Sequence, residues 1–186
     1  MSPTISRSLI PRLAVCAVMA AALLPCSAKS ICADSKIAAG KSLGSLALGM
    51  SLDQAIELVG KPGLEEQTGK LDGSEWRKLY YYPGSDFYLI AQDRKVVELA
   101  LGGGTEDTQS CSTGEGIRLG AKARRVKAAY GEPEEKARQG ATTADWTYGR
   151  IGIGFTVDSQ GGVLGVRVFL PGMLETLKRR EEVLGW

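Results

Sequence analysis

Apolar residues recur at helical spacing just after Ser51, and this pattern predicts a helix of about nine residues. Ser51 and Gln54 have the spacing of a capping box, in which each side chain accepts a hydrogen bond from the other residue's backbone. Gly60 can end the helix in a left-handed conformation, and Pro62 prevents its continuation. The apolar stripe comprises Leu52, Ala55, Ile56 and Val59.

Residues of strand character follow this helix and predict three strands, at residues 75–82, 87–92 and 95–101. Pro83-Gly84-Ser85-Asp86 is turn chemistry between the first two strands, and Asp93-Arg94 is a tight connection between the last two. Residues 61–74 contain glycines and mixed charges without a strong period, so we expect this stretch to be irregular.

The same order then repeats at a step of 71 residues, which relates Leu48-Gly49 to Leu119-Gly120. The step also relates Gly60 to Gly131 and Pro62 to Pro133, while Trp76 corresponds to Trp146 at a step of 70. Such self-similarity indicates one supersecondary unit used twice. In the second unit Lys122 replaces the capping serine, and strands are predicted at residues 142–148, 151–157 and 163–170.

Strand residues of the second unit alternate cleanly between apolar and small or polar, as in an antiparallel sheet covered on a single side. The last residues, 173–186, place leucines at helical spacing and predict an amphipathic helix, with Lys178, Arg179 and Arg180 on its solvated face. The fold class is therefore α+β, with two tandem units, each a short helix (or helix-loop-helix) packed on one face of an antiparallel β-meander, plus a C-terminal amphipathic helix. The predicted divisions are residues 46–104 and 113–171 for the two units, 105–112 for a linker and 172–186 for the final helix.

The first residues have the pattern of an export signal. Arg7 and Arg12 precede an apolar run at residues 13–24, which is shorter than the roughly 20 residues that span a bilayer. We expect cleavage of residues 1–28 after Ala28, or after Ala33, and no stable membrane span afterwards. Pro25 before Cys26 argues against a lipoprotein. The predicted location is the periplasm or the outside of the cell, with residues 29–45 as a flexible leader.

Cleavage after Ala28 removes two of the 23 basic residues and none of the 21 acidic ones, which leaves a net charge of zero. This balance argues against nucleic acid as the main partner. Cys32 and Cys111 remain after this cleavage, and an oxidising compartment favours a disulfide between them. The bridge requires that their Cα atoms approach within about 7 Å, and cleavage after Ala33 would remove Cys32.

Each unit carries the signature of an apolar-Leu-Gly motif, a short helix, Gly-x-Pro and a tryptophan in the following strands. The residues are Leu48-Gly49-Met50-Ser51, Gly60-Lys61-Pro62 and Trp76 in the first unit, and Leu119-Gly120, Gly131-Glu132-Pro133 and Trp146-Thr147-Tyr148 in the second. This signature resembles the family that contains the outer-membrane assembly lipoprotein SmpA, OmlA or BamE and the secreted β-lactamase inhibitor protein. The resemblance implies a binding-module role and places the turn ending at Asp86 where the inhibitor presents an acidic loop.

The sequence contains no histidine, which removes the usual general base and the commonest metal ligand. Neither a nucleophile elbow nor a phosphate-binding loop is present. We therefore expect no catalytic residues, no metal, no cofactor and no enzymatic activity.

The first predicted sheet has apolar residues on both faces, so one face is left for a partner or for another part of the chain. Trp76, Lys78, Tyr80 and Tyr82 share a face in a regular strand, and a mid-strand lysine is seldom buried unpaired. We predict that these residues, with Asp86, form an open binding surface. The alternative is that the final helix, the leader or the second unit covers it.

The sequence thus favours a non-enzymatic protein-binding module, inhibitor-like or envelope-assembly-like, with a protein partner in the cell envelope or outside the cell. A binder of small molecules or cell-wall fragments in a pocket between the two units is the alternative. The oligomeric state stays open.

Overall fold

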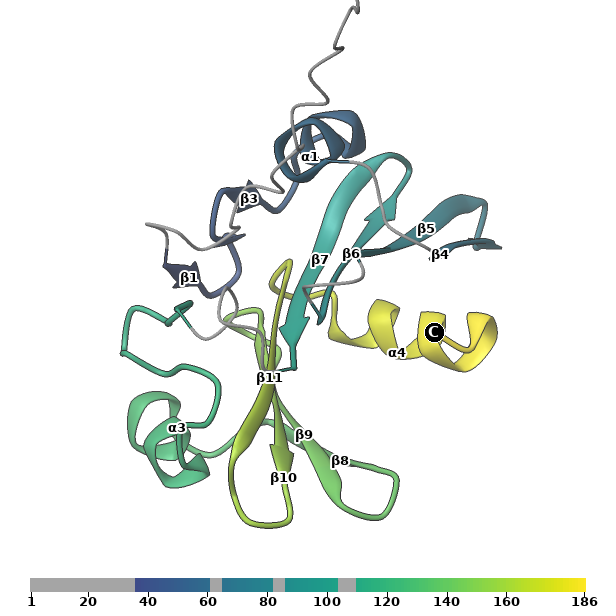
Figure 1. The fold of residues 1–186 in the computed structure, drawn as a ribbon. Coiled ribbons are helices and arrows are strands. Elements are labelled where there is room, and N and C mark those ends of the chain that lie inside the picture. The colour runs from purple at the N-terminus through teal and green to yellow at the C-terminus, as the bar shows by residue number, and fades with distance from the viewer. Residues whose placement is uncertain (1–35, 61–64, 82–85, 104–109) are drawn as a thin grey trace, which may run out of the picture.

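The computed structural model describes residues 36–60, 65–81, 86–103 and 110–186. In these residues eight strands form one antiparallel sheet and three two-residue strands form another (Figure 1). The helices are α1 (Leu52–Val59), α3 (Ala123–Tyr130) and α4 (Leu174–Leu184). The strands are β1 (Ile37–Ala38), β2 (Ser42–Leu43), β3 (Leu46–Ala47), β4 (Glu65–Leu71), β5 (Ser74–Tyr81), β6 (Asp86–Gln92), β7 (Lys95–Gly102), β8 (Glu135–Gln139), β9 (Thr143–Tyr148), β10 (Ile153–Asp158) and β11 (Val163–Phe169).

The large sheet has the strand order β4-β5-β6-β7-β11-β10-β9-β8. Its two meanders meet where β7 pairs with β11, with Leu101 opposite Val166 and Glu98 opposite Phe169. The predicted α+β class with antiparallel strands is confirmed. The two meanders nevertheless belong to one continuous sheet, because each leaves the edge of its last strand free to pair with the other.

The segment before each of the first two helices is bonded to the last strand of its own meander in the same way. The backbone N–H of Gly49 donates to the carbonyl of Val96 at 2.7 Å, and that of Gly120 donates to Val163 at 2.8 Å. Gly49 and Gly120 have φ of 82° and 77°, a region that favours glycine. This backbone requirement explains why glycine follows leucine at both places.

Helix α1 begins with the predicted capping box, since Ser51 and Gln54 each accept from the other's backbone N–H at 3.2 Å. Helix α3 begins at Ala123, and its N-cap residue Lys122 makes no side-chain cap, as the sequence indicates.

We expect Ser51→Ala to lower the free energy of unfolding by about 1 kcal/mol, because the first turn of α1 loses its side-chain acceptor. Lys122→Ala, at the corresponding position of α3, is the control and should change stability by less than about 0.5 kcal/mol. Urea unfolding followed by circular dichroism measures both, and equal effects would contradict the capping role.

Two expectations about irregular segments are wrong, and the sequence pattern misses one further strand. Residues 61–74 contain the edge strand β4, and the predicted leader contributes β1 and β2, whose Ile37 and Leu43 are buried in the core. The stretch after α3 contains β8, the opposite edge strand. Edge strands face solvent over much of their surface, so they carry charged residues at many positions. The alternation of apolar and polar residues that identifies a strand in the sequence is then lost.

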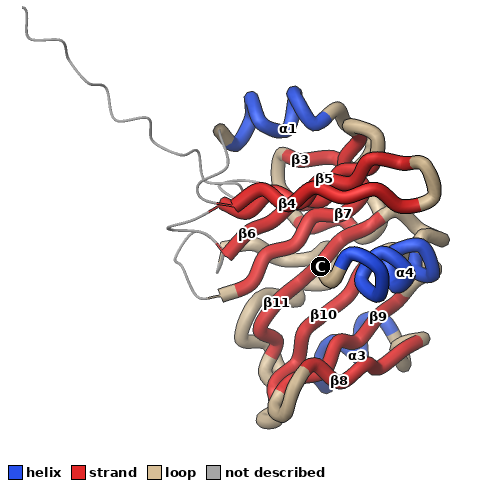
Figure 2. The backbone as a smooth tube through the Cα atoms, turned by 90° about the vertical axis from the view of Figure 1, so that its right-hand side faces the viewer, coloured by secondary structure: helices blue, strands red, loops and turns tan. Residues whose placement is uncertain are grey.

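The large sheet carries a core on each face, and the final helix covers the second face, which is the alternative to an open face that the sequence left standing. One core joins α1, α3 and β1–β3 to the sheet, and the other lies under α4. Figure 2 shows α4 in front of the sheet with α3 behind it. Gly69 and Gly149 leave room for α4, because a Cβ at these positions would come within 2.8 and 2.9 Å of Leu184 and Leu174.

No helix in the described part of the chain is long and apolar enough to cross a bilayer. Cys111 is disulfide-bonded. Cys32, its predicted partner, lies outside the described residues, as do residues 1–28 of the predicted signal. Strand β1, which follows Cys32 in the sequence, lies beside the residue that follows Cys111, because the backbone N–H of Ile37 donates to the carbonyl of Ser112 at 2.8 Å.

We expect a tryptic digest of the exported, unreduced protein to contain residues 30–36 linked to residues 96–118 through Cys32 and Cys111. Mass spectrometry after alkylation, with and without reductant, measures this. Alkylated Cys32 before reduction would contradict the pairing.

Candidate functional site

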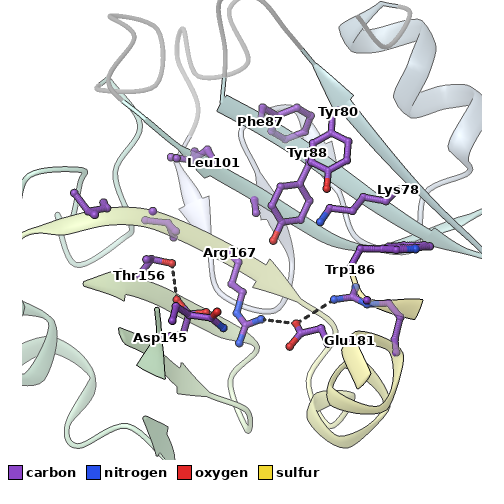
Figure 3. Close-up of a pocket in the computed structure, with 18 residues that line it drawn as sticks. Lys78, Tyr80, Phe87, Tyr88, Leu101, Asp145, Thr156, Arg167, Glu181 and Trp186 are labelled. Carbon is purple, nitrogen blue, oxygen red and sulfur yellow. Dashed lines mark hydrogen bonds and ion pairs between the residues drawn. The ribbon is translucent and has the colours of Figure 1, made fainter. Parts of the chain in front are cut away.

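A cavity of about 620 Å³ opens on the α4 side of the sheet, across the line where β7 and β11 join the two meanders. We call it the junction pocket (Figure 3). Lys78, Tyr80 and Tyr88 reach it from the first meander, Asp145 and Arg167 from the second, and Glu181 and Trp186 from α4 and the residues after it. Side chains from three parts of the chain thus converge on one space.

Small residues lower the floor of the junction pocket. Ala100 and Gly165 line it, and a Cβ added to Gly165 would lie 3.3 Å from the carbonyl oxygen of Leu101. Gly154 has a related role beside the pocket, because its Cβ would come within 2.8 Å of the Nε atom of Arg167. The glycine therefore lets the arginine side chain lie flat along the sheet.

A buried ion pair supports the wall formed by α4. Arg180 is 2% exposed and Glu98 is fully buried, and an Nη1–H of Arg180 donates to Oε2 of Glu98 at 2.9 Å. The hydroxyl of Tyr88 donates to the other carboxylate oxygen at 3.1 Å. These two bonds satisfy both oxygens of a carboxylate that would otherwise be costly to bury.

The charges of this cluster shift its pKa values. Burial alone would raise the pKa of Glu98, but the guanidinium groups of Arg180 and Arg167 outweigh it and hold this pKa below its ordinary value. Burial and the Glu98 carboxylate raise the pKa of Tyr88 well above its ordinary value. At neutral pH the cluster therefore contains a carboxylate, two guanidinium groups and a neutral tyrosine.

Arg167 crosses the middle of the pocket, as Figure 3 shows. Its Nη2 donates to the hydroxyl of Thr147 at 2.9 Å, and its Nη1 lies 3.4 Å from Oε1 of Glu181. Lys78 holds its ammonium 4.8 Å from the ring centre of Tyr80 and 4.5 Å from that of Tyr88. Both cations are thus positioned by their neighbours before any ligand arrives.

The predicted binding residues divide into three groups. Lys78 and Tyr80 line the junction pocket. The prediction that Trp76 lies on an open surface is wrong, because it is 1% exposed in the core under α4. Asp86 begins β6 opposite Gly102, and Tyr82 lies outside the described residues.

The correspondence between Trp76 and Trp146 also fails in space. Trp76 belongs to the core under α4, whereas Trp146 packs against the core on the other face of the sheet. Their similar positions in the sequence therefore do not give them one role.

Glu98, Arg167 and Arg180 are not among the residues that the sequence pattern predicts for a site. The helical spacing places Arg180 on a solvated face, but Arg180 is buried. Glu98 and Arg167 are each a charged residue within an otherwise apolar strand, and this pattern is the signal in the sequence that could have identified them. Their pairing depends on β7 lying beside β11 and under α4, which the sequence pattern does not indicate.

Among the described residues, no group of three or more histidine, cysteine, aspartate or glutamate side chains is placed to hold a metal ion.

No known protein family matches this sequence, and no curated protein matches it either. Two solved structures are similar at low identity. The uncharacterised protein YfeY from Escherichia coli has a TM-score of 0.49 at 12% identity, over 71% of this chain and 98% of that one. An extracellular protein containing an SCP domain from Bacillus anthracis has a TM-score of 0.47 at 15% identity, over 72% of this chain and 46% of that one.

Proposed function

We propose that this chain is an exported, non-enzymatic binding protein that holds a small ligand in the junction pocket. The observation that carries the proposal is the pocket itself, in which cationic, aromatic and apolar side chains from both meanders and from the α4 segment converge. A concave site with a few positioned polar groups is the usual form of a ligand site.

A small-ligand binder was the alternative that the sequence left open, and two observations favour it over a protein-binding module. The aromatic face expected to contact a protein is partly covered by α4, which buries Trp76. The large apolar side chains that remain exposed in the described residues lie on four different parts of the fold, namely Leu58 on α1, Ile151 between β9 and β10, Leu164 on β11 and Val183 on α4. Single exposed apolar residues do not make a partner surface.

Export is supported by the apolar run after Arg12 and by the disulfide at Cys111, since disulfides persist in oxidising compartments. The proposed location is the periplasm or the outside of the cell.

We also propose that the two meanders are copies of one unit. The matched glycine bonds before α1 and α3 support this duplication, as does the antiparallel pairing of the two final strands, β7 and β11. The resemblance to the BamE and β-lactamase inhibitor family belongs to the same proposal. In this arrangement the junction pocket lies where the copies meet.

Co-purification tests the binding function. The protein is isolated from the exporting cells and analysed by native mass spectrometry, and the ligand is released by denaturation. We expect an added mass on the wild type and on Gly114→Val, whose new side chain meets open space. Gly165→Val raises the pocket floor and should lose that mass, so equal loading of the two variants would contradict the proposal.

A further inference from the structure

We infer that the ligand is an amphiphilic carboxylate, whose head group binds between Lys78 and Arg167 and whose apolar part extends toward Leu164. This inference rests on the proposed binding function and specifies the chemistry of its ligand.

Lys78 is the cation of the pocket that lacks a carboxylate partner. No carboxylate oxygen of the described residues lies within ion-pair distance of it, although Arg167 and Arg180 both contact acids. Its ammonium instead lies over the rings of Tyr80 and Tyr88. A ring face attracts the cation but leaves its hydrogen-bond donors unused, so an anion can still bind them.

Arg167 offers a second set of donors. Nη1 and Nη2 each make one contact, to Glu181 and Thr147, and each carries a further N–H. The contact to Glu181 is long, at 3.4 Å, and Glu181 also accepts from Arg180 at 3.1 Å. A ligand carboxylate can therefore take over the Nη1 of Arg167 while Glu181 stays paired with Arg180.

The acids of the pocket are already occupied, which disfavours a cationic ligand. Glu181 accepts from Arg167 and Arg180, and Glu98, which does not line the pocket, accepts on both oxygens from Arg180 and Tyr88. Asp145 accepts from the hydroxyl of Thr156 at 2.6 Å. Both lining acids therefore already accept hydrogen bonds, whereas the ammonium of Lys78 has no carboxylate partner among the described residues.

The other end of the pocket is apolar. Leu164 is 43% exposed there and lines the pocket together with Ala100 and Gly165, whereas Phe87, Leu101 and Val166 have their side chains buried in the core on the opposite face of the sheet. Burying the apolar part of a ligand on Leu164 supplies binding energy that a small inorganic anion would not gain. The separation of donors from apolar surface argues for an amphiphile rather than for a fully polar ion.

The test compares three probes with the same tail, namely dodecanoate, dodecanol and dodecyltrimethylammonium, below their micelle concentrations. Binding is followed by calorimetry and by tryptophan fluorescence, because Trp186 lines the pocket. We expect dodecanoate to bind about tenfold more tightly than either other probe, as a charge-assisted hydrogen bond implies. A leucine-rich peptide with a free α-carboxylate, compared with its amide, shows whether a peptide end can supply the same head group.

Lys78→Gln should remove most of the preference for dodecanoate over dodecanol, whereas Lys95→Gln, at an exposed lysine outside the pocket, should keep it. Arg167→Gln should have the same effect as Lys78→Gln, and circular dichroism checks that each variant is folded. Unchanged preference in folded Lys78→Gln, or equal binding of all three probes, would overturn the carboxylate assignment.

Gly165→Val distinguishes the failure of the carboxylate assignment from the failure of the proposed binding function. Suppose that the three probes bind the wild type equally and that Gly165→Val binds none of them. The junction pocket is then the binding site, and the head-group assignment is wrong. If dodecanoate binds Gly165→Val as it binds the wild type, the site lies elsewhere and both proposals are wrong.

Discussion

Arg180→Met is expected to lower the free energy of unfolding by about 3–5 kcal/mol, the usual cost of breaking a buried ion pair. Methionine is unbranched like the arginine stem but removes the guanidinium, whose carbon lies 5.9 Å from the ring centres of Trp76 and Trp186, so the loss arises mainly from the charged group. Glu98 remains fully buried with Tyr88 as its one close donor. Urea unfolding of the purified protein measures the change.

Arg179→Met is the matched control, because Arg179 is the neighbouring arginine on α4 and its ion pair with Asp72 is exposed. An exposed pair contributes about 1 kcal/mol or less, so this variant should stay close to the wild type. Adding Glu98→Gln to Arg180→Met should recover part of the lost stability, since the unpaired carboxylate is then gone. Equal effects of the two arginine variants would contradict the buried ion pair.

The same pair gives stability a defined pH dependence. Because the pKa of Glu98 is lower in the folded chain than its ordinary value, its contribution is fully present above about pH 4.3, the ordinary pKa of glutamate. It is lost as the pH falls through the lowered pKa of the folded protein. Glu98→Gln should therefore weaken the acid sensitivity of unfolding.

Features set by local chemistry could be predicted from the sequence. The capping box at Ser51 and the glycine that ends α1 lie within one short segment, so their residues identify the helix without knowledge of the fold. The six strands with recognisable strand patterns were also located to within about two residues.

Features set by distant contacts could not be predicted. Arg180 looks like a solvated residue of an amphipathic helix until α4 is placed on Glu98 of β7. Edge strand β8 carries charged residues and is exposed at all but its first residue, so it has no apolar alternation to identify it. The junction pocket depends on the pairing of β7 with β11, a long-range contact that no local pattern encodes.

The largest packing effect is expected at Trp76, where the sequence left the choice between an open face and a core. Its side chain is fully covered by α4 and the sheet, so Trp76→Ala should lower the free energy of unfolding by about 3 kcal/mol or more. The indole N–H has no hydrogen-bond partner, so its removal leaves no acceptor unsatisfied.

Tyr80→Ala is the comparison, because Tyr80 lies on the same strand face but is only half-buried at the pocket. We expect it to cost less than half as much stability as Trp76→Ala and to weaken ligand binding, since Lys78 loses one of the rings that position its ammonium. Thermal and urea unfolding of both variants, with dodecanoate titration of Tyr80→Ala, give the comparison. A small effect of Trp76→Ala would mean that α4 does not stay packed on this face in solution, and the wall of the junction pocket would then be missing.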